Sequence, residues 1–197
     1  AEVDEASGSE EDMIAGLKDI DICVTQMAPL TQRVIESANA LKLICVTRGG
    51  PVNVNLDAAR RKGIAVCAAP GRNAAATAEH TMALLLAALR KIPSRHSEII
   101  AGEWRSDFYA FDQVGFEIGG STVGLIGYGA VGRQVARMLK GFGARVMVYD
   151  PFATIDAIDG VIQENDLQQL LASSRIISLH ARLTKDTRSM IGAAQLA

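Results

Sequence analysis

Apolar runs of strand length alternate with stretches of helical spacing along the first third of the chain. Helices are expected over 10–18 and 31–38, and strands over 20–24, 41–46 and 64–67. Asn55 is placed to cap a further helix before the last of these strands, and Gly63 is placed to end it. This alternation favours a parallel, doubly wound sheet.

The middle of the chain is helical and rich in apolar residues. An Ala- and Leu-rich stretch over 74–90 predicts a long helix that is apolar nearly all round, and Pro93 opens a second helix that ends near Gly102. Aromatic residues crowd the irregular segment 104–116, named here the aromatic arm. Such surfaces are costly to leave in water. We therefore expect the long helix and the arm to pack on a neighbouring domain or another subunit.

The alternation of strands and helices resumes at Thr122. Strands are expected over 122–126, 144–149 and 176–179, and helices over 130–141, 166–172 and from about 192 onward. The pattern therefore predicts two α/β units, residues 1–72 and 73–197, which meet near Arg72.

Composition and charge narrow the class of protein. With 49% apolar residues, 21% charged residues and a net charge of −2, the chain is typical of a globular protein. The 20 Lys and Arg are scattered, so no nucleic-acid partner is expected. No apolar run is long enough to cross a membrane and no secretory signal is visible, so we expect no membrane partner and a cytoplasmic location. Cys23, Cys45 and Cys67 lie in strand-like runs and are expected to be reduced core thiols rather than disulfide or metal ligands.

A glycine-rich motif follows the strand expected over 122–126. Gly127-Tyr128-Gly129-Ala130-Val131-Gly132 opens a helix, and Asp150 ends the next strand, 18 residues after Gly132. In this context Gly127 allows a tight turn, Gly129 lets a pyrophosphate approach the backbone, and Gly132 lets helix and strand pack closely. The amides of Ala130 and Val131 then point at the phosphates from a helix N-terminus.

Asp150 sets the expected cofactor. Its carboxylate can accept hydrogen bonds from the adenosine ribose and would repel a 2′-phosphate, and Pro151-Phe152 offer no Arg to counter that repulsion. NAD is therefore favoured over NADP. The alternative interpretation is that the glycines serve only turns and packing and that Asp150 caps a strand.

Two further segments resemble a known family. Residues 53–66, NVNLDAARRKGIAV, resemble the "DNIDLEAATRRGIVV" segment of the D-isomer-specific 2-hydroxyacid dehydrogenases. A second resemblance is between the family's "APGxNxxxVAEH" segment and residues 69–80, APGRNAAATAEH, which run from Ala69 to His80. The family's order is then kept by Trp104, the glycine motif, VYDP and Ser178-Leu179-His180. The resemblance, which runs from about Leu17 to the end, implies a partial flavodoxin-like substrate domain over 1–72 and an NAD-binding Rossmann domain over 73–197.

The resemblance also implies roles for single residues. Gly49 and Gly50 match a loop whose amides hold the substrate carboxylate, as a Gly-rich nest can, and Asn73 matches a residue near the reacting carbon. Thr77 and Ala181 match cofactor contacts, which join Gly127, Gly129, Ala130, Val131, Gly132 and Asp150. The 74–90 helix and the arm match the family's dimer interface, so a homodimer is expected.

The substrate loop departs from the family pattern. The family reads R-x-G-x-G-x-D-N, whereas this chain reads Arg48-Gly49-Gly50-Pro51-Val52-Asn53, which is shorter and carries a proline. Arg48 fits two roles: it could fork onto a second anionic group of a substrate, or it could pair with a carboxylate at the domain edge. Arg182 stands where the family has a proline. The three histidines show no metal-ligand spacing, so no metal is expected.

The resemblance implies hydride transfer between nicotinamide and C2 of a D-2-hydroxy acid or 2-oxo acid. The family's catalytic Arg, Glu and His would fall after Ala197, so no catalytic residue is assigned and this chain alone is expected to be inactive. The alternative is a non-catalytic NAD-binding module for dimerisation or cofactor sensing, similar to corepressor relatives.

Overall fold

The structure is a computed structural model that describes residues 2–156 and 159–196. The chain divides into two compact units between Arg72 and Asn73: unit 1 over residues 1–72 and unit 2 over residues 73–197. The substrate-binding and cofactor-binding roles expected for these two stretches remain predictions at this point.

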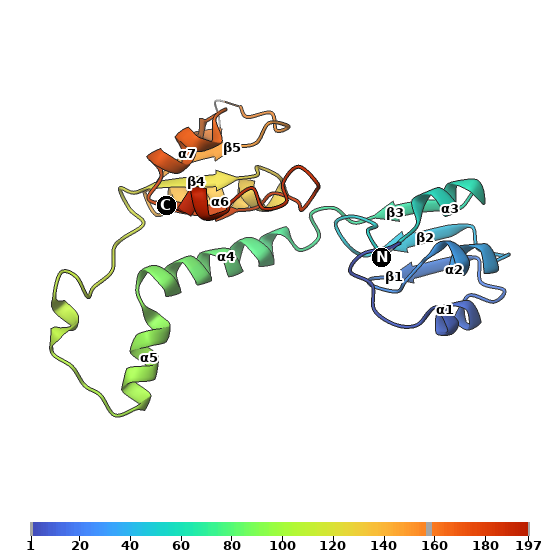
Figure 1. Ribbon diagram of the computed structural model, residues 1–197, viewed down its shortest axis with the longest axis horizontal. Helices are drawn as coiled ribbons and strands as arrows, with labels where there is room; N and C mark the ends of the chain where they lie inside the picture. Colours follow the sequence, from blue (N-terminus) through green and yellow to red (C-terminus); the bar gives the residue numbers. More distant parts are fainter. Residues whose placement is uncertain (1, 157–158, 197) are drawn as a thin grey trace. The chain divides into compact units, whose positions relative to one another are not determined.

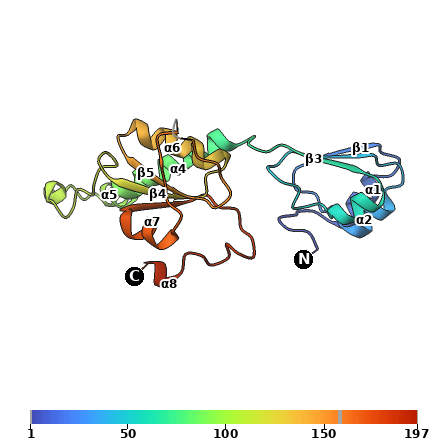
Figure 2. The ribbon, with the colours of Figure 1, turned by 90° about the horizontal axis from the view of Figure 1, so that it is seen from above.

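Unit 1 is a three-stranded parallel sheet with helices on one face. Its elements are α1 (Glu10–Gly16), β1 (Ile22–Thr25), α2 (Gln32–Ser37), β2 (Leu43–Val46), α3 (Leu56–Arg61) and β3 (Ala65–Ala68), and the strand order is β1-β2-β3. Both crossovers run in the same direction, so α2 and α3 share one side of the sheet (Figure 2). Asn55 caps α3 by accepting the Ala58 amide at 2.8 Å, as its position predicted.

Helices of unit 1 pack on only one of the two faces of this sheet. Ile44 and Cys23 pack with the helices in a buried core. Val24, on the opposite face, is 67% exposed. The expectation of three core thiols is therefore wrong for two of them, because Cys45 is half-buried and Cys67 is exposed on the face without helices. The strand order β1-β2-β3 never reverses, so the described part of unit 1 is not doubly wound as had been expected.

Unit 2 holds a four-stranded parallel sheet covered on both faces. Its elements are α4 (Ala74–Leu89), α5 (Ile92–Ile100), a 3-10 turn over Asp107–Tyr109, β4 (Thr122–Ile126), α6 (Ala130–Gly141), β5 (Arg145–Tyr149), β6 (Ile162–Gln163), α7 (Leu167–Ser173), β7 (Ile176–Leu179) and α8 (Ala193–Leu196). The strand order is β6-β5-β4-β7, which is doubly wound as expected. Figure 1 shows α7 and α4 on opposite sides of β4.

The core of unit 2 lies on either side of β4. Val123 and Leu125 pack with α4 and α6, whereas Ile126 packs with Leu170 of α7. Gly124 lets α7 come close, because a Cβ there would lie 2.6 Å from Leu170 Cδ2. The two helix layers therefore fix the central strand that carries the glycine motif.

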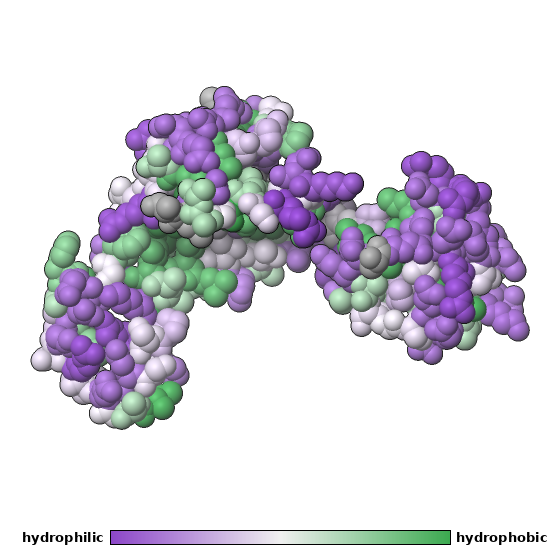
Figure 3. All heavy atoms as spheres, viewed as in Figure 1, coloured by the Kyte–Doolittle hydropathy of each residue, from purple (hydrophilic) through white to green (hydrophobic). Residues whose placement is uncertain are grey.

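The long apolar helix and the aromatic arm are only partly buried. Ala78 and Met82 of α4 are buried, whereas Leu84 is 59% exposed. In the arm, Trp104 is 88% and Phe111 97% exposed, so the chain itself does not bury these rings. Figure 3 shows hydrophobic residues gathered beside α4. No helix among residues 2–156 and 159–196 is long and apolar enough to span a membrane.

Candidate cofactor site

The glycine motif lies where the strand order of unit 2 reverses. β4 pairs in parallel with β5 on one side and with β7 on the other. The chain leaves β4 through residues 127–129 and enters α6 at Ala130. In doubly wound sheets the carboxyl edge at such a reversal is the place where ligands bind.

Two of the three glycines are required by close packing within the chain. Gly127 has a φ of +99°, and a Cβ there would lie 2.6 Å from the Ala181 nitrogen. A Cβ at Gly132 would lie 2.3 Å from the Gly127 carbonyl oxygen. These glycines therefore let the turn, α6 and the segment after β7 approach one another, as the sequence predicted for the first and third positions.

Gly129 differs from the other two, because a Cβ there would meet nothing within 4 Å. It is the N-cap of α6, and no side chain in the described chain caps the helix. The first amides of a helix have no partner within it, so those of Ala130 and Val131 are available to an anion at this open end. Space above Gly129 and donors beside it are what a diphosphate requires.

Asp150 faces the glycine motif from the end of β5. One carboxylate oxygen accepts the Tyr128 amide at 2.7 Å, and the other accepts the amides of Phe152 and Ala153 at 2.9 and 3.1 Å. The Gly127 amide also donates to the Tyr149 carbonyl at 2.9 Å. The carboxylate is thus held beside the loop by backbone groups, on the side where a ribose attached to the diphosphate would lie.

The segment after β7 closes the third side of the loop. The His180 amide donates to the Ile126 carbonyl at 2.7 Å, which holds Ala181 next to Gly127. The His180 ring lies 2.9 Å from the Ser178 hydroxyl, and burial lowers the pKa of His180. The ring is therefore neutral near pH 7 and acts as a hydrogen-bonded packing group.

Arg133 is a functional candidate that sequence reasoning did not single out. Its guanidinium donates to Asp159 at 3.0 Å and to the Thr154 carbonyl at 2.8 Å, and it lies 4.4 Å from the centre of the Tyr128 ring. It therefore ties the segment after Asp150 to the first turn of α6. Its place directly after Gly132 was the available signal, but both of its hydrogen-bond partners lie more than twenty residues away in sequence.

The remaining predicted residues belong to other elements of the two units. Thr77 is exposed in the first turn of α4, next to Ala78, which packs in the same core as Tyr128. Asn73 is the N-cap of α4 and starts unit 2. Gly49 and Gly50 follow β2 in unit 1, where a Cβ at Gly49 would meet nothing within 4 Å.

Arg48 has a partner within unit 1. Its guanidinium contacts the Glu5 carboxylate and donates to the Glu5 carbonyl at 3.2 Å. This contact matches one of its two expected roles, the ion pair, and the other, a contact with an anionic group of a substrate, stays a prediction. Arg182 is exposed in the loop after β7.

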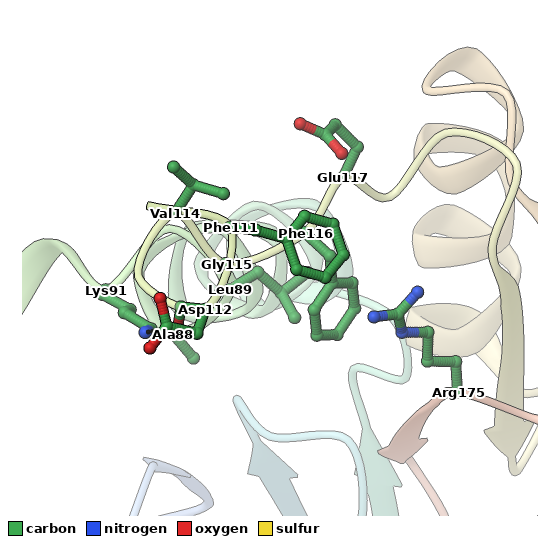
Figure 4. A pocket seen from close by; sticks show the side chains of 10 residues that line it. All are labelled: Ala88, Leu89, Lys91, Phe111, Asp112, Val114, Gly115, Phe116, Glu117 and Arg175. Carbon is green, nitrogen blue, oxygen red and sulfur yellow. Dashed lines mark hydrogen bonds between the residues drawn. The ribbon is translucent and has the colours of Figure 1, made fainter. Parts of the chain in front are cut away.

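A hollow of about 600 Å³ lies elsewhere in unit 2, between the end of α4, the arm and Arg175. Figure 4 shows the Arg175 guanidinium beside the Phe116 ring, 3.8 Å from its centroid. Arg175 precedes β7, so this hollow is at the amino edge of the sheet, opposite to the glycine motif. The open carboxyl edge, rather than the hollow, has the geometry of a nucleotide site. Within the described residues no cluster of His, Cys, Asp or Glu could hold a metal.

Fold and loop together define a dinucleotide-binding α/β protein. Residues 82–197 match the family model described as "D-isomer specific 2-hydroxyacid dehydrogenase, NAD binding domain". The chain belongs to this family, and its cofactor is NAD.

Individual relatives agree with the family. The chain is 36% identical to D-3-phosphoglycerate dehydrogenase of Methanocaldococcus jannaschii over 100% of its own length and 37% of the relative. It is 33% identical to glyoxylate reductase of Korarchaeum cryptofilum, covering 98% and 59%. It resembles a crystal structure of D-lactate dehydrogenase from Aquifex aeolicus complexed with NAD and lactic acid, with a TM-score of 0.80, 28% identity and coverage of 96% and 55%. The chain thus spans between about a third and three fifths of the length of these proteins.

Proposed function

We propose that this chain is part of an NAD-dependent oxidoreductase that transfers a hydride between nicotinamide and C2 of a D-2-hydroxy acid or 2-oxo acid. The observation that carries the proposal is the loop 127–132 at the strand reversal, with Asp150 bound to its backbone. Family membership and the relatives' names support the same reaction class.

In the proposed cofactor complex each part of the loop has one task. The amides of Ala130 and Val131 bind the diphosphate above Gly129, and Asp150 accepts hydrogen bonds from the adenosine ribose. Ala181 and Thr77 flank the cofactor, and Arg133 positions the segment that follows Asp150. Bound NAD supplies the hydride acceptor, and NADH the hydride donor.

On the substrate side, the proposal places the carboxylate of the acid at the Gly49 and Gly50 amides, with Asn73 near the reacting carbon. The open space at Gly49 supports this assignment. Arg48 then stabilises the loop through Glu5, and the bare amides form the anion site.

We also propose that the chain forms a homodimer through α4 and the aromatic arm. The support is an exposed apolar surface that includes Leu84, Trp104, Tyr109 and Phe111, and single-chain proteins rarely leave so many large apolar side chains in water. We further propose that the protein is cytoplasmic, and the support is that its three cysteines are free thiols, as is usual in a reducing compartment.

The reaction is tested by following NADH absorbance while 2-oxo acids are added to the natural protein that contains this chain. The panel is glyoxylate, hydroxypyruvate, phosphohydroxypyruvate and pyruvate, the oxo forms of acids linked to the relatives' names. We expect one acid to be reduced at least about ten times faster than the others, since one pocket contact or charge changes specificity by that much. If NADH binds and none of the acids is reduced, the cofactor assignment stands and the proposed reaction is refuted.

A further inference from the structure

A single guanidinium joins the two segments that hold Asp150. One segment is the glycine motif, where the Tyr128 amide donates to one Asp150 oxygen at 2.7 Å. The other is the turn over residues 151–154 after β5, two of whose amides donate to the second oxygen. Arg133, in the first turn of α6, contacts both segments.

The contacts of Arg133 are of three kinds. Its guanidinium carbon lies 4.4 Å from the centre of the Tyr128 ring, and Tyr128 is 3% exposed. Its Nη2 group donates to the Thr154 carbonyl at 2.8 Å, and its Nη1 group donates to the Asp159 carboxylate at 3.0 Å. A flat guanidinium can stack on a ring and donate to two acceptors at its edge, which a lysine ammonium cannot do.

These contacts restrain the turn over residues 151–154 more than a surface ion pair would. An isolated exposed ion pair contributes little, because both side chains lose freedom and water screens their charges. Here the Tyr128 ring is buried, one acceptor is a backbone carbonyl, and the Asp159 side chain is 26% exposed. Lys140 also donates to the Asp159 carbonyl, which ties Asp159 to α6 independently of Arg133. Loss of Arg133 should therefore loosen mainly residues 151–154.

We propose that Arg133 is a positioning residue for the adenosine half of NAD, because it fixes the two segments whose amides hold the Asp150 carboxylate at the ribose. This inference rests on the proposed binding of NAD at residues 127–132. Arg133 acts through Asp150 and does not itself touch the nucleotide. A carboxylate that is already aligned loses less conformational freedom when the ribose binds, so removal of its support should lower the affinity.

The test uses ADP-ribose, which carries the diphosphate and the adenosine ribose but no nicotinamide. Its affinity for the natural protein that contains this chain is measured by isothermal titration calorimetry. We expect Arg133→Met to bind ADP-ribose about tenfold more weakly, roughly the equivalent of one charge-assisted hydrogen bond. The matched control is Arg137→Met, which removes the same charge from an exposed position one turn further along α6 and should match the unmodified protein.

A double-mutant cycle with Asp150→Ala separates positioning from general support of the fold. Because Arg133 acts through the Asp150 carboxylate, Arg133→Met should change the affinity for ADP-ribose less than about twofold once that carboxylate is gone. A merely structural role would instead lower the affinity by the same factor in both backgrounds.

Steady-state kinetics give a second readout. With a 2-oxo acid that the natural protein reduces, Arg133→Met should raise the KM for NADH about tenfold and leave kcat unchanged, because the ribose is held equally in the ground state and the transition state. If no 2-oxo acid is reduced, the proposed reaction fails, and the calorimetric cycle still decides the role of Arg133.

The positioning role is overturned if Arg133→Met binds ADP-ribose normally, if its effect is undiminished beside Asp150→Ala, or if kcat falls while KM stays unchanged. Failure of the unmodified protein to bind ADP-ribose would refute the proposed NAD site and the role of Arg133 with it. Where Arg133→Met does not fold, Asp159→Asn takes its place in the cycle, because it removes the ion pair and keeps the bond to Thr154. The same direction of change is then expected.

Discussion

At the scale of single residues, Asp150 combines a structural and a binding task. Its two carboxylate oxygens accept three backbone amides, which ties the end of β5 to the loop after β4. A carboxylate offers about four acceptor sites, so these three bonds leave one, on the oxygen that accepts the Tyr128 amide, for a ribose hydroxyl. The side chain can therefore be changed in ways that separate its negative charge from its acceptor oxygens.

Replacement of Asp150 should alter cofactor choice. Asp150→Asn keeps one acceptor oxygen but no charge, so we expect the preference for NADH over NADPH to shrink. Asp150→Arg removes the acceptors, and its NADH affinity should fall about 10- to 100-fold, the equivalent of one or two charge-assisted hydrogen bonds. Fluorescence titration with both nucleotides measures these changes.

The control for charge is Asp57→Arg, which makes the same change of charge on an exposed helix of unit 1. Its affinities for both nucleotides should match those of the unmodified chain. Unchanged NADH affinity in Asp150→Arg would show that Asp150 does not contact the cofactor.

At the scale of elements, the turn from β4 to α6 was well predicted from sequence. Thr122–Ile126 and Ala130–Gly141 have the expected bounds, because strand-like and helical patterns meet at glycines there. β6 was missed, since two residues carry no periodicity. The exposure of Cys67 was also missed, because an apolar strand does not reveal which of its faces a helix covers. Arg133 was missed because its partners are distant in sequence.

The glycines of this turn should separate stability from binding. Gly132→Ala places a Cβ 2.3 Å from a backbone oxygen, so we expect the free energy of unfolding of unit 2 to fall by about 1–3 kcal/mol. Gly129→Ala meets no atom within 4 Å and should cost less than about 1 kcal/mol. Its methyl group would instead obstruct the diphosphate, so NADH affinity should fall at least about tenfold.

Thermal melts and NADH titrations on both variants check this contrast. If Gly129→Ala binds NADH normally, the diphosphate does not lie above that residue. If Gly132→Ala is as stable as the unmodified chain, the close approach of loop and helix is less strict than the structure indicates.

At the scale of the whole molecule, the exposed apolar surface of α4 and the arm governs assembly. We expect light scattering after size exclusion to give twice the mass of one polypeptide. Phe111→Asp and Leu84→Asp each place a charge where the partner would pack, and each should weaken association at least about tenfold.

Val24→Asp is the control for assembly, because Val24 is also apolar and, at 67%, exposed, but lies in unit 1. It should leave the dimer unchanged. A monomeric unmodified chain at micromolar concentration, or a dimer that only Val24→Asp disrupts, would contradict the proposed interface.

The hydrogen bonds from the chain to Asp150 also bear on how quickly a nucleotide is captured. These bonds form within the folded chain before any nucleotide binds. The conformational entropy of ordering residues 127–132 is therefore lost during folding and not when the nucleotide binds. Capture should then follow a single exponential whose rate constant rises linearly with nucleotide concentration, without the plateau that a slow rearrangement of this turn would impose.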